Sequence, residues 1–240
     1  MVPPKIDLTN PSAVVTEIFD NDQWIKDEFT THLSLEILQF SEVLAQSFKY
    51  FPQLDSLSSN GDEQAAFVAG FIFGVFDDLL VSMKLLVAGK MIASGNLMRQ
   101  AIEGVAVAIL CASRAPISVY KQKQLIKIDY WKKLKSRDSL VRSHHAIRQL
   151  ELNCDALGVS REAINKLLKA QKQYHQFSHP GLIGLASHMD LGELGPIYIG
   201  GNFDEAKLPV YKIEISERTG LCGVLPNMID VLVLRLRKKN

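Results

Sequence analysis

The chain has 240 residues, 47% of them hydrophobic and 22% charged, and its formal net charge at pH 7 is +1. This composition is ordinary for a soluble globular protein of one domain over residues 1–240, and its three cysteines, without a C-x-x-C pair, exclude a zinc knuckle and a disulfide framework. Residues 1–15 hold no continuous apolar stretch, so we expect no secretory signal and a cytoplasmic location.

The first predicted elements are a flexible lead-in and a long helix. Residues 1–21 are rich in proline, and we expect at most one short helix there, around residues 12–19. From Gln23 to Phe51 apolar residues recur every three or four positions, which predicts an amphipathic helix that Pro52 ends. The polar residues 54–62 are expected to form a loop.

The most apolar part of the chain, residues 63–113, predicts a buried helical hairpin with Gly89 and Lys90 near its turn. Its longest apolar run covers residues 65–76 and stops at two aspartates. A membrane span needs about 20 apolar residues. We therefore expect no contact with a membrane, and we expect the other elements to pack on this hairpin.

The middle of the chain predicts further helices. A loose apolar face over residues 117–157 indicates a second long helix, or two joined ones, with Gly158 at the end. Ser160 is an expected N-cap for the following helix, because its hydroxyl can accept hydrogen bonds from free backbone N–H groups. That helix is expected to end near His179.

The tail has a different pattern. Alternation around residues 211–215, together with residues 197–199, predicts a small two-stranded β-hairpin before a last amphipathic helix. The expected fold is therefore mainly α: a bundle of about five or six helices around a central hairpin, with a small C-terminal β-hairpin. The lead-in covers residues 1–21, the helical bundle 22–190, and the β-hairpin with the terminal helix 191–240.

Charge is distributed unevenly along the chain. Residues 1–63 hold three Lys and eleven Asp or Glu, a balance of −8, and residues 114–148 hold ten Lys or Arg and two Asp, a balance of +8. One interpretation is that these segments lie close together, within a protomer or between the protomers of a homo-oligomer. The other is that residues 114–148 contact RNA or another polyanion.

Standard cofactor and metal motifs are missing. The glycines match neither a dinucleotide-binding loop nor a P-loop, so no cofactor is expected. His175 and His179 have the i, i+4 spacing of two ligands in a helical zinc site, but the spacing selects no third ligand. We therefore predict no metal site.

Charged residues on the second helix of the apolar hairpin form one candidate site. Asn96, Arg99 and Glu103 share a stripe that continues into apolar Ala106 and Leu110. Arg99 and Glu103 are expected to form an i, i+4 ion pair that is partly removed from water. Both a structural role, fixing helix register, and a functional role remain open.

A second candidate lies in the basic segment. Arg137 is followed by a polar residue and, seven positions on, by His144. This pattern resembles the R-x(4–6)-H motif of HEPN-domain ribonucleases, whose Arg and His from two protomers meet at a dimer interface and cut RNA without metal. The resemblance implies that His144 transfers a proton and that Arg137 stabilises the phosphate.

A wider resemblance spans about residues 65–180. The order LMRQAIE at Leu97–Glu103, then Trp131, then YHQFSHP at Tyr174–Pro180 resembles uncharacterised bacterial helical proteins grouped loosely with HEPN and abortive-infection proteins. Those proteins have an R-x-x-x-E helix and a later Tyr/Ser…His-Pro segment. The resemblance implies that Arg99, Glu103, Tyr174 and His179 converge in one pocket.

Three hypotheses for function follow. The first is binding of a ligand or partner through a partly buried pocket in which Arg99 recognises an anion, Glu103 holds Arg99, and Tyr174 with His179 completes the wall. The second is a HEPN-like metal-independent ribonuclease of a defence or toxin system. The third is a structural or dimerisation module, in which the acidic N-terminal segment pairs with the basic segment.

Overall fold

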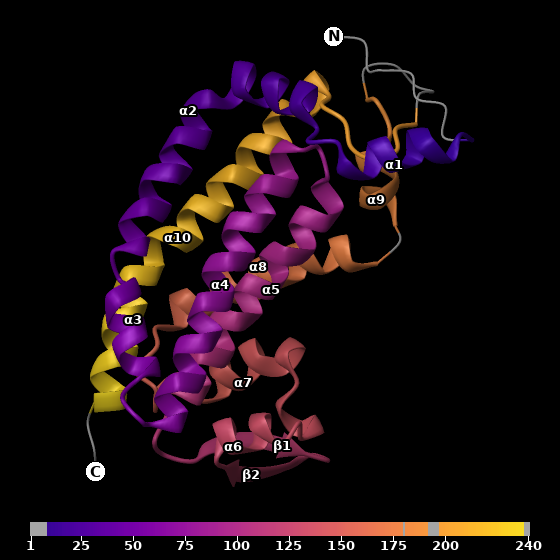
Figure 1. The fold of residues 1–240 in the computed structure, drawn as a ribbon. Helices are drawn as coiled ribbons and strands as arrows, with labels where there is room; N and C mark the ends of the chain where they lie inside the picture. The colour runs from indigo at the N-terminus through magenta and orange to yellow at the C-terminus, as the bar shows by residue number, and fades with distance from the viewer. Residues whose placement is uncertain (1–8, 180, 192–196, 238–240) are drawn as a thin grey trace.

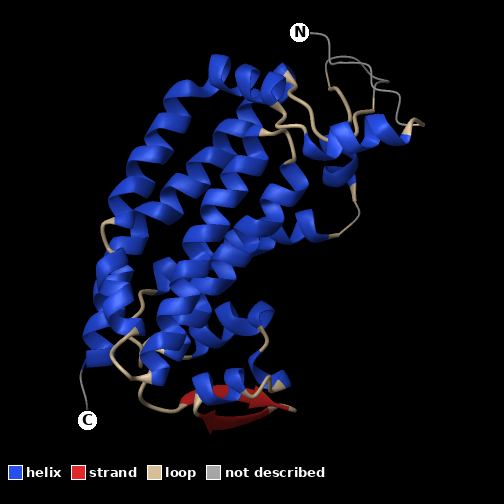
Figure 2. Cartoon of the chain, viewed as in Figure 1, coloured by secondary structure: helices blue, strands red, loops and turns tan. Residues whose placement is uncertain are grey.

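The computed structural model describes residues 9–179, 181–191 and 197–237 and confirms that the chain is mainly α (Figures 1 and 2). Its α-helices are α1 Pro11–Phe19, α2 Gln23–Phe48, α3 Phe51–Ser58, α4 Glu63–Val87, α5 Met91–Cys111, α6 Tyr130–Lys135, α7 Ala146–Leu152, α8 Arg161–His175, α9 Leu182–His188 and α10 Leu208–Arg237. Its strands and 3-10 turns are β1 Ile117–Lys121, β2 Gln124–Ile128, η1 Ser139–Val141, η2 Ser143–His145, η3 Gln176–Ser178 and η4 Glu205–Lys207.

The predicted central hairpin is confirmed as α4 and α5, which pack along each other over their whole length. The Asp62 side chain caps α4 by accepting a hydrogen bond from the Ala65 amide. Gly89 makes the turn with a φ of 71°. A Cβ there would lie 2.5 Å from the backbone of Asn202. Both the left-handed backbone and the close approach therefore require glycine at this position.

The long N-terminal helix is confirmed with a correction at its end. It runs as α2 to Phe48 with a kink at Leu33, and α3 follows where a loop from residue 54 was predicted. Pro52 lies in the first turn of α3, where a missing N–H costs no hydrogen bond. Leu54 and Leu57 are buried, so packing on α4 stabilises a helix that the polar composition alone does not favour.

The predicted helix over residues 117–157 is wrong. The chain instead forms the antiparallel hairpin β1–β2, then α6, η1, η2 and α7. The Asn153 side chain, from just beyond α7, accepts a hydrogen bond from the Ser118 amide (2.9 Å) and donates one to the Ser118 carbonyl (2.8 Å). This clasp satisfies the outer edge of β1, so the strand is stable against the helices although the hairpin has only two strands. The hairpin also lies inside the region 22–190 that was predicted to be helical.

The predicted C-terminal β-hairpin is also wrong, because α10 covers residues 211–215. The residues buried there, Tyr211, Glu214, Ile215 and Arg218, have the three-and-four spacing of a helix. In α10 this stripe faces the core, where Tyr211 packs on Phe29 of α2 and Arg218 bonds to α4 and α5, and burial outweighs the local alternation. Among the described residues of the tail, the β-contact is an isolated bridge between Met189 and Ile197.

The expected short helix is confirmed as α1, and residues 1–8 of the predicted flexible lead-in lie outside the described residues.

Two described helices, Glu63–Val87 and Glu205–Arg237, are long and apolar enough to cross a membrane. Core helices of soluble proteins meet the same criterion, so this is weak evidence for a membrane protein.

A fully satisfied polar network lies in the core between α4, α5, α8 and α10. Arg218 is 0% exposed and donates hydrogen bonds to Glu214 Oε2 (2.8 Å), Ser94 Oγ (2.6 Å) and Ser82 Oγ (3.2 Å). The Tyr174 hydroxyl donates to Glu214 Oε2 at 3.0 Å. Because each helix contributes a partner, the network fixes how α5 and α8 lie against each other.

Candidate functional site

The predicted pair of Arg99 and Glu103 is present and partly buried. Arg99 Nε donates to Glu103 Oε1 at 2.9 Å, and the two side chains are 20% and 8% exposed. The pair lies one turn beyond Ser94, which belongs to the buried network. The backbone of α5 is thus held by the core just before the charged stripe begins.

The 3-10 turn η3, directly after α8, completes the surroundings of Arg99. Arg99 Nη1 donates to Ser178 Oγ at 2.8 Å, and Ser178 Oγ donates to Asn96 Oδ1 at 2.8 Å. Gly95 makes this contact possible, because a Cβ at that position would lie 2.5 Å from the ring of Phe177. Phe177 therefore seats directly on α5 and places Ser178 over the guanidinium.

Arg99 retains hydrogen-bonding capacity. Its guanidinium has five N–H donors in a fixed plane, and two of them bond to Glu103 and Ser178. Nη2 bonds to none of the described residues and is not one of their fully buried unpaired side-chain atoms. The remaining nitrogen, Nη2, can therefore donate to an oxygen of a carboxylate or phosphate while Nε and Nη1 stay held.

Gln171 connects this pair to the basic segment. Its Nε2 donates to Glu103 Oε1 and to the backbone carbonyl of His144, both at 3.2 Å. The turn η2, which carries His144 and His145, therefore lies beside α5 and α8. We call Asn96, Arg99, Glu103, Gln171 and Ser178 the polar cluster.

Two histidines adjoin the polar cluster. His175 and His179 are exposed, and their ring centroids lie 4.6 Å apart at an interplanar angle of 72°. His179 follows Ser178 directly, but it makes no hydrogen bond to Arg99 or Glu103 among the described contacts. No group of three or more His, Cys, Asp or Glu that could hold a metal ion occurs among the described residues.

Tyr174 is placed apart from the other expected pocket residues. It is 0% exposed and bonds to Glu214 in the core network. Burial raises the pKa of its hydroxyl above the ordinary value. Its ring contacts Phe177 at 5.6 Å between centroids. Tyr174 therefore anchors the end of α8, and through Phe177 it supports the position of Ser178.

Arg137 and His144 do not contact each other within the chain. Arg137 is exposed in the turn after α6, with a φ of 56°, and His144 is exposed in η2. The His144 and His145 rings lie 4.0 Å apart. Partial burial, followed by the nearby charge of His144, Arg142 and Arg148, lowers the pKa of His145 below its ordinary value. His145 therefore favours the neutral form, which can accept a proton.

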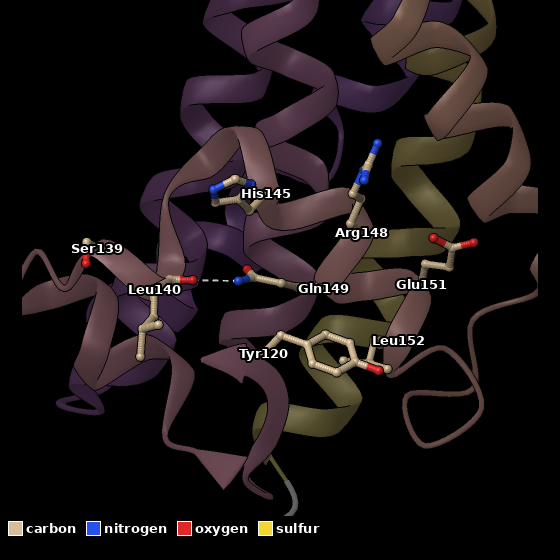
Figure 3. A pocket seen from close by; sticks show the side chains of 8 residues that line it. All are labelled: Tyr120, Ser139, Leu140, His145, Arg148, Gln149, Glu151 and Leu152. Atoms are coloured by element: carbon tan, nitrogen blue, oxygen red, sulfur yellow. Dashed lines mark hydrogen bonds between the residues drawn. The ribbon is translucent and has the colours of Figure 1, made fainter. Parts of the chain in front are cut away.

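A surface hollow of about 550 Å³ lies between β1, η1, η2 and α7 (Figure 3). Gln149 points across it, bonded to the Leu140 carbonyl, with Tyr120 on one side and His145 and Arg148 on the other. Its lining residues, here called the hollow, are Tyr120, Ser139, Leu140, His145, Arg148, Gln149, Glu151 and Leu152.

The surroundings of the hollow carry unbalanced positive charge. In the basic segment, Arg114 pairs with Asp62 and Lys135 pairs with Glu63, which joins the segment to the start of α4. The basic residues of this segment that form no ion pair with the described residues are Lys121, Lys123, Lys127, Arg137, Arg142 and Arg148.

Sequence reasoning missed three residues of this region. Gln171 and Ser178 are neutral, and their roles depend on partners 68 and 79 positions away. Ser178 lies within the YHQFSHP stretch, so that stretch was a usable signal for it. Gly95, which directly precedes Asn96, was a second signal, because a glycine inside a helix indicates that another part of the chain approaches the helix closely.

Comparison of the chain with protein-family models, with curated proteins and with solved structures gives no match. The function proposed below is therefore argued from the chemistry of the polar cluster and its neighbours.

Proposed function

We propose that the protein binds an anionic ligand, of the phosphate or carboxylate class, at the polar cluster. The observation that carries this proposal is the Nη2 of Arg99, which bonds to none of the described residues while Glu103 and Ser178 hold Nε and Nη1. The guanidinium is thus fixed in place before the ligand arrives, which lowers the entropy cost of binding. His175 and His179 lie next to Ser178 and supply further donors to an anion.

Glu103 has a positioning role in this proposal. Its Oε1 accepts from both Arg99 and Gln171, so it holds the guanidinium and links it to the loop that carries His144. A carboxylate close to an anion site repels the anion, so if charge alone matters, removing the carboxylate strengthens binding. If the position of Arg99 matters more, removing the carboxylate weakens binding.

The test is a calorimetric titration of the full chain with inorganic pyrophosphate. Arg99→Gln is expected to weaken binding about 10- to 100-fold, because a hydrogen bond to a charged group contributes about 1.5–3 kcal/mol. The matched control is Arg161→Gln, since Arg161 is exposed at the start of α8 and pairs with Asp155. Equal losses in both variants, or no saturable binding by the unmodified chain, would refute the proposal.

Glu103→Gln separates positioning from charge. We expect it to weaken pyrophosphate binding, because a neutral amide oxygen holds Arg99 less strongly than a carboxylate, although the variant carries one negative charge fewer. Stronger binding would show that only net charge acts at this surface. Circular dichroism of each variant establishes that the helices are retained.

Metal-independent cleavage of RNA is the second candidate function, in a HEPN-like protein of a bacterial defence system. It is favoured by the Gln171 contact, which brings η2 with His144 and His145 to the polar cluster, and by the unpaired cations of the basic segment. His144 would transfer the proton and Arg137, from a second protomer, would stabilise the phosphate. A soluble cytoplasmic helical bundle is the setting we propose for either function.

Cleavage of a single-stranded RNA in the presence of EDTA tests this second function. His144→Ala and Arg137→Ala are each expected to remove activity, while His32→Ala, on α2, is the control. Cleavage that persists in the His144→Ala variant, or that EDTA abolishes, would exclude this mechanism. Anion binding at Arg99 is measured separately and does not depend on the outcome.

A further inference from the structure

The helix α1 has an exposed apolar face. None of its residues is buried, and Val15, Ile18 and Phe19 are 54%, 70% and 83% exposed. An isolated helix of this length is marginal in water, and clustered exposed apolar side chains mark contact surfaces. Its ionisable groups, Glu17 and the C-capping Asp20, are acidic. We call residues 11–20 the N-terminal arm.

The hollow has the complementary character. Tyr120 and Leu152 are 63% and 38% exposed, and Leu125, which is paired with Tyr120 across the hairpin, is 56% exposed. Arg148 and Glu151 line the same surface with opposite charges, and Lys121, next to Tyr120 in the chain, brings the formal net charge to +1 with the histidine neutral. The hollow thus offers an apolar wall beside positive charge, where the arm offers apolar side chains beside negative charge.

The arm and the hollow of one chain lie at opposite ends of the α4–α5 hairpin (Figure 1). At one end, Arg114 and Lys135 of the basic segment pair with Asp62 and Glu63, where α4 begins. At the other end, Glu17 of the arm lies beside Gly200, and the neighbouring Gly201 lies against the carbonyl of Ala88, where α4 ends. Since α4 has 25 residues, about 37 Å at 1.5 Å per residue, the arm does not reach the hollow of its own chain.

We propose that the hollow receives the N-terminal arm of a second copy, in a two-fold dimer whose chains run antiparallel. In this arrangement each arm meets the partner's hollow, so both contacts form together and the assembly closes. Phe19 and Ile18 of one chain pack on Tyr120 and Leu152 of the other, while Glu17 and Asp20 face Arg148 and Lys121. The opposite charges of the two segments are then compensated between chains.

A second copy is favoured over nucleic acid as the occupant. A polyanion would use the cations but would leave the arm's apolar residues exposed, whereas the dimer buries the apolar residues of both surfaces. The proposal does not depend on anion binding at Arg99. It is an alternative to the ribonuclease dimer, because chains that run antiparallel keep Arg137 of one copy away from His144 of the other.

Sedimentation velocity of the full chain over a range of concentrations tests the dimer. Phe19→Glu and Arg148→Glu are each expected to give monomers at concentrations where the unmodified chain is dimeric. Leu35→Glu and Arg161→Glu are the matched controls, because both positions are exposed and lie outside the arm and the hollow. Ile18→Glu and Tyr120→Asp form a second pair in case one of the first variants is misfolded by circular dichroism.

Mixing gives the decisive result. Equal amounts of Phe19→Glu and Arg148→Glu chains are expected to form a dimer that neither forms alone. The intact arm of the Arg148→Glu chain can enter the intact hollow of the Phe19→Glu chain. Raised salt is expected to dissociate the unmodified dimer, since charges contribute to the contact.

Three outcomes would overturn the proposal. The first is an unmodified chain that stays monomeric up to its solubility limit. The second is a dimer that both variants retain, which would place the interface elsewhere. The third is a dimer unaffected by Arg148→Glu together with loss of binding to a single-stranded RNA oligonucleotide, which would make the hollow a nucleic-acid site.

Discussion

Replacing Arg218 by Met is a direct test of how the core holds the polar cluster. The side chain is 0% exposed, and Met keeps most of its apolar volume while removing the hydrogen bonds to Glu214, Ser82 and Ser94. The carboxylate of Glu214, in a residue that is 2% exposed, then keeps the Tyr174 hydroxyl as its side-chain partner among the described residues and has no positive charge beside it. Both serines keep the hydrogen bonds that they donate to backbone carbonyls, so the main cost falls on Glu214.

The expected magnitude follows from the unpaired charge. Breaking a buried ion pair by removing one partner costs about 3–5 kcal/mol. For a chain of this size, about 2–4 °C of melting temperature corresponds to 1 kcal/mol, so we expect a fall of about 6–20 °C. Urea unfolding followed by circular dichroism measures the free energy of unfolding, and a thermal scan checks it.

The double variant Arg218→Met/Glu214→Leu provides the control. It removes both charges, so we expect it to recover most of the stability that the single variant loses. A single variant within about 1 kcal/mol of the unmodified chain, or a double variant as unstable as the single one, would refute the reasoning. The single variant is also expected to weaken pyrophosphate binding, because α5 and α8 lose their shared anchor.

Three further outcomes are expected. Gly95→Ala places a Cβ against the Phe177 ring, so we expect a loss of about 1–3 kcal/mol and weaker pyrophosphate binding, by thermal unfolding and titration. Asp78→Asn tests a pKa that partial burial, and then Asp77, raise to about 6 from 3.8. A raised carboxyl pKa means that the folded state binds the proton more tightly, so the unmodified chain loses stability as the pH rises from about 4 to 6. After allowance for solvent screening, the variant is expected to be more stable than the unmodified chain by about 1 kcal/mol above pH 6, and equally stable below pH 4. Urea unfolding curves over a pH series measure this difference, and its absence would contradict the reasoning. Asn153→Ala removes the clasp on Ser118, so a loss of about 1–3 kcal/mol and faster hydrogen exchange in β1 are expected.

Features with a local cause were predicted well from the sequence. The α4–α5 hairpin follows from apolar periodicity and from Gly89, and the start of α8 follows from the Ser160 cap, which accepts from the Ala163 amide. The Arg99–Glu103 contact follows from i, i+4 geometry. Each of these depends on residues within a few positions of one another.

Errors arose where distant partners decide the structure. Residues 117–128 pair as strands because Asn153 binds the edge of β1, and residues 211–215 are helical because their buried stripe meets α2 at Tyr211 and α8 at Glu214. At both places the local pattern of apolar residues indicated the wrong class of secondary structure, because it carries no information about these distant partners.

The candidate site shows the same division. The sequence by itself determined the central helical hairpin and an ion pair on its second helix, because helical geometry places residues three and four apart side by side. Only the tertiary structure decided that Ser178 and Gln171 complete the surroundings of Arg99, that Tyr174 belongs to the core with Glu214, and that the acidic arm and the basic hollow lie at opposite ends. These facts depend on which helices pack together, and packing is set by burial of surfaces far apart in the chain.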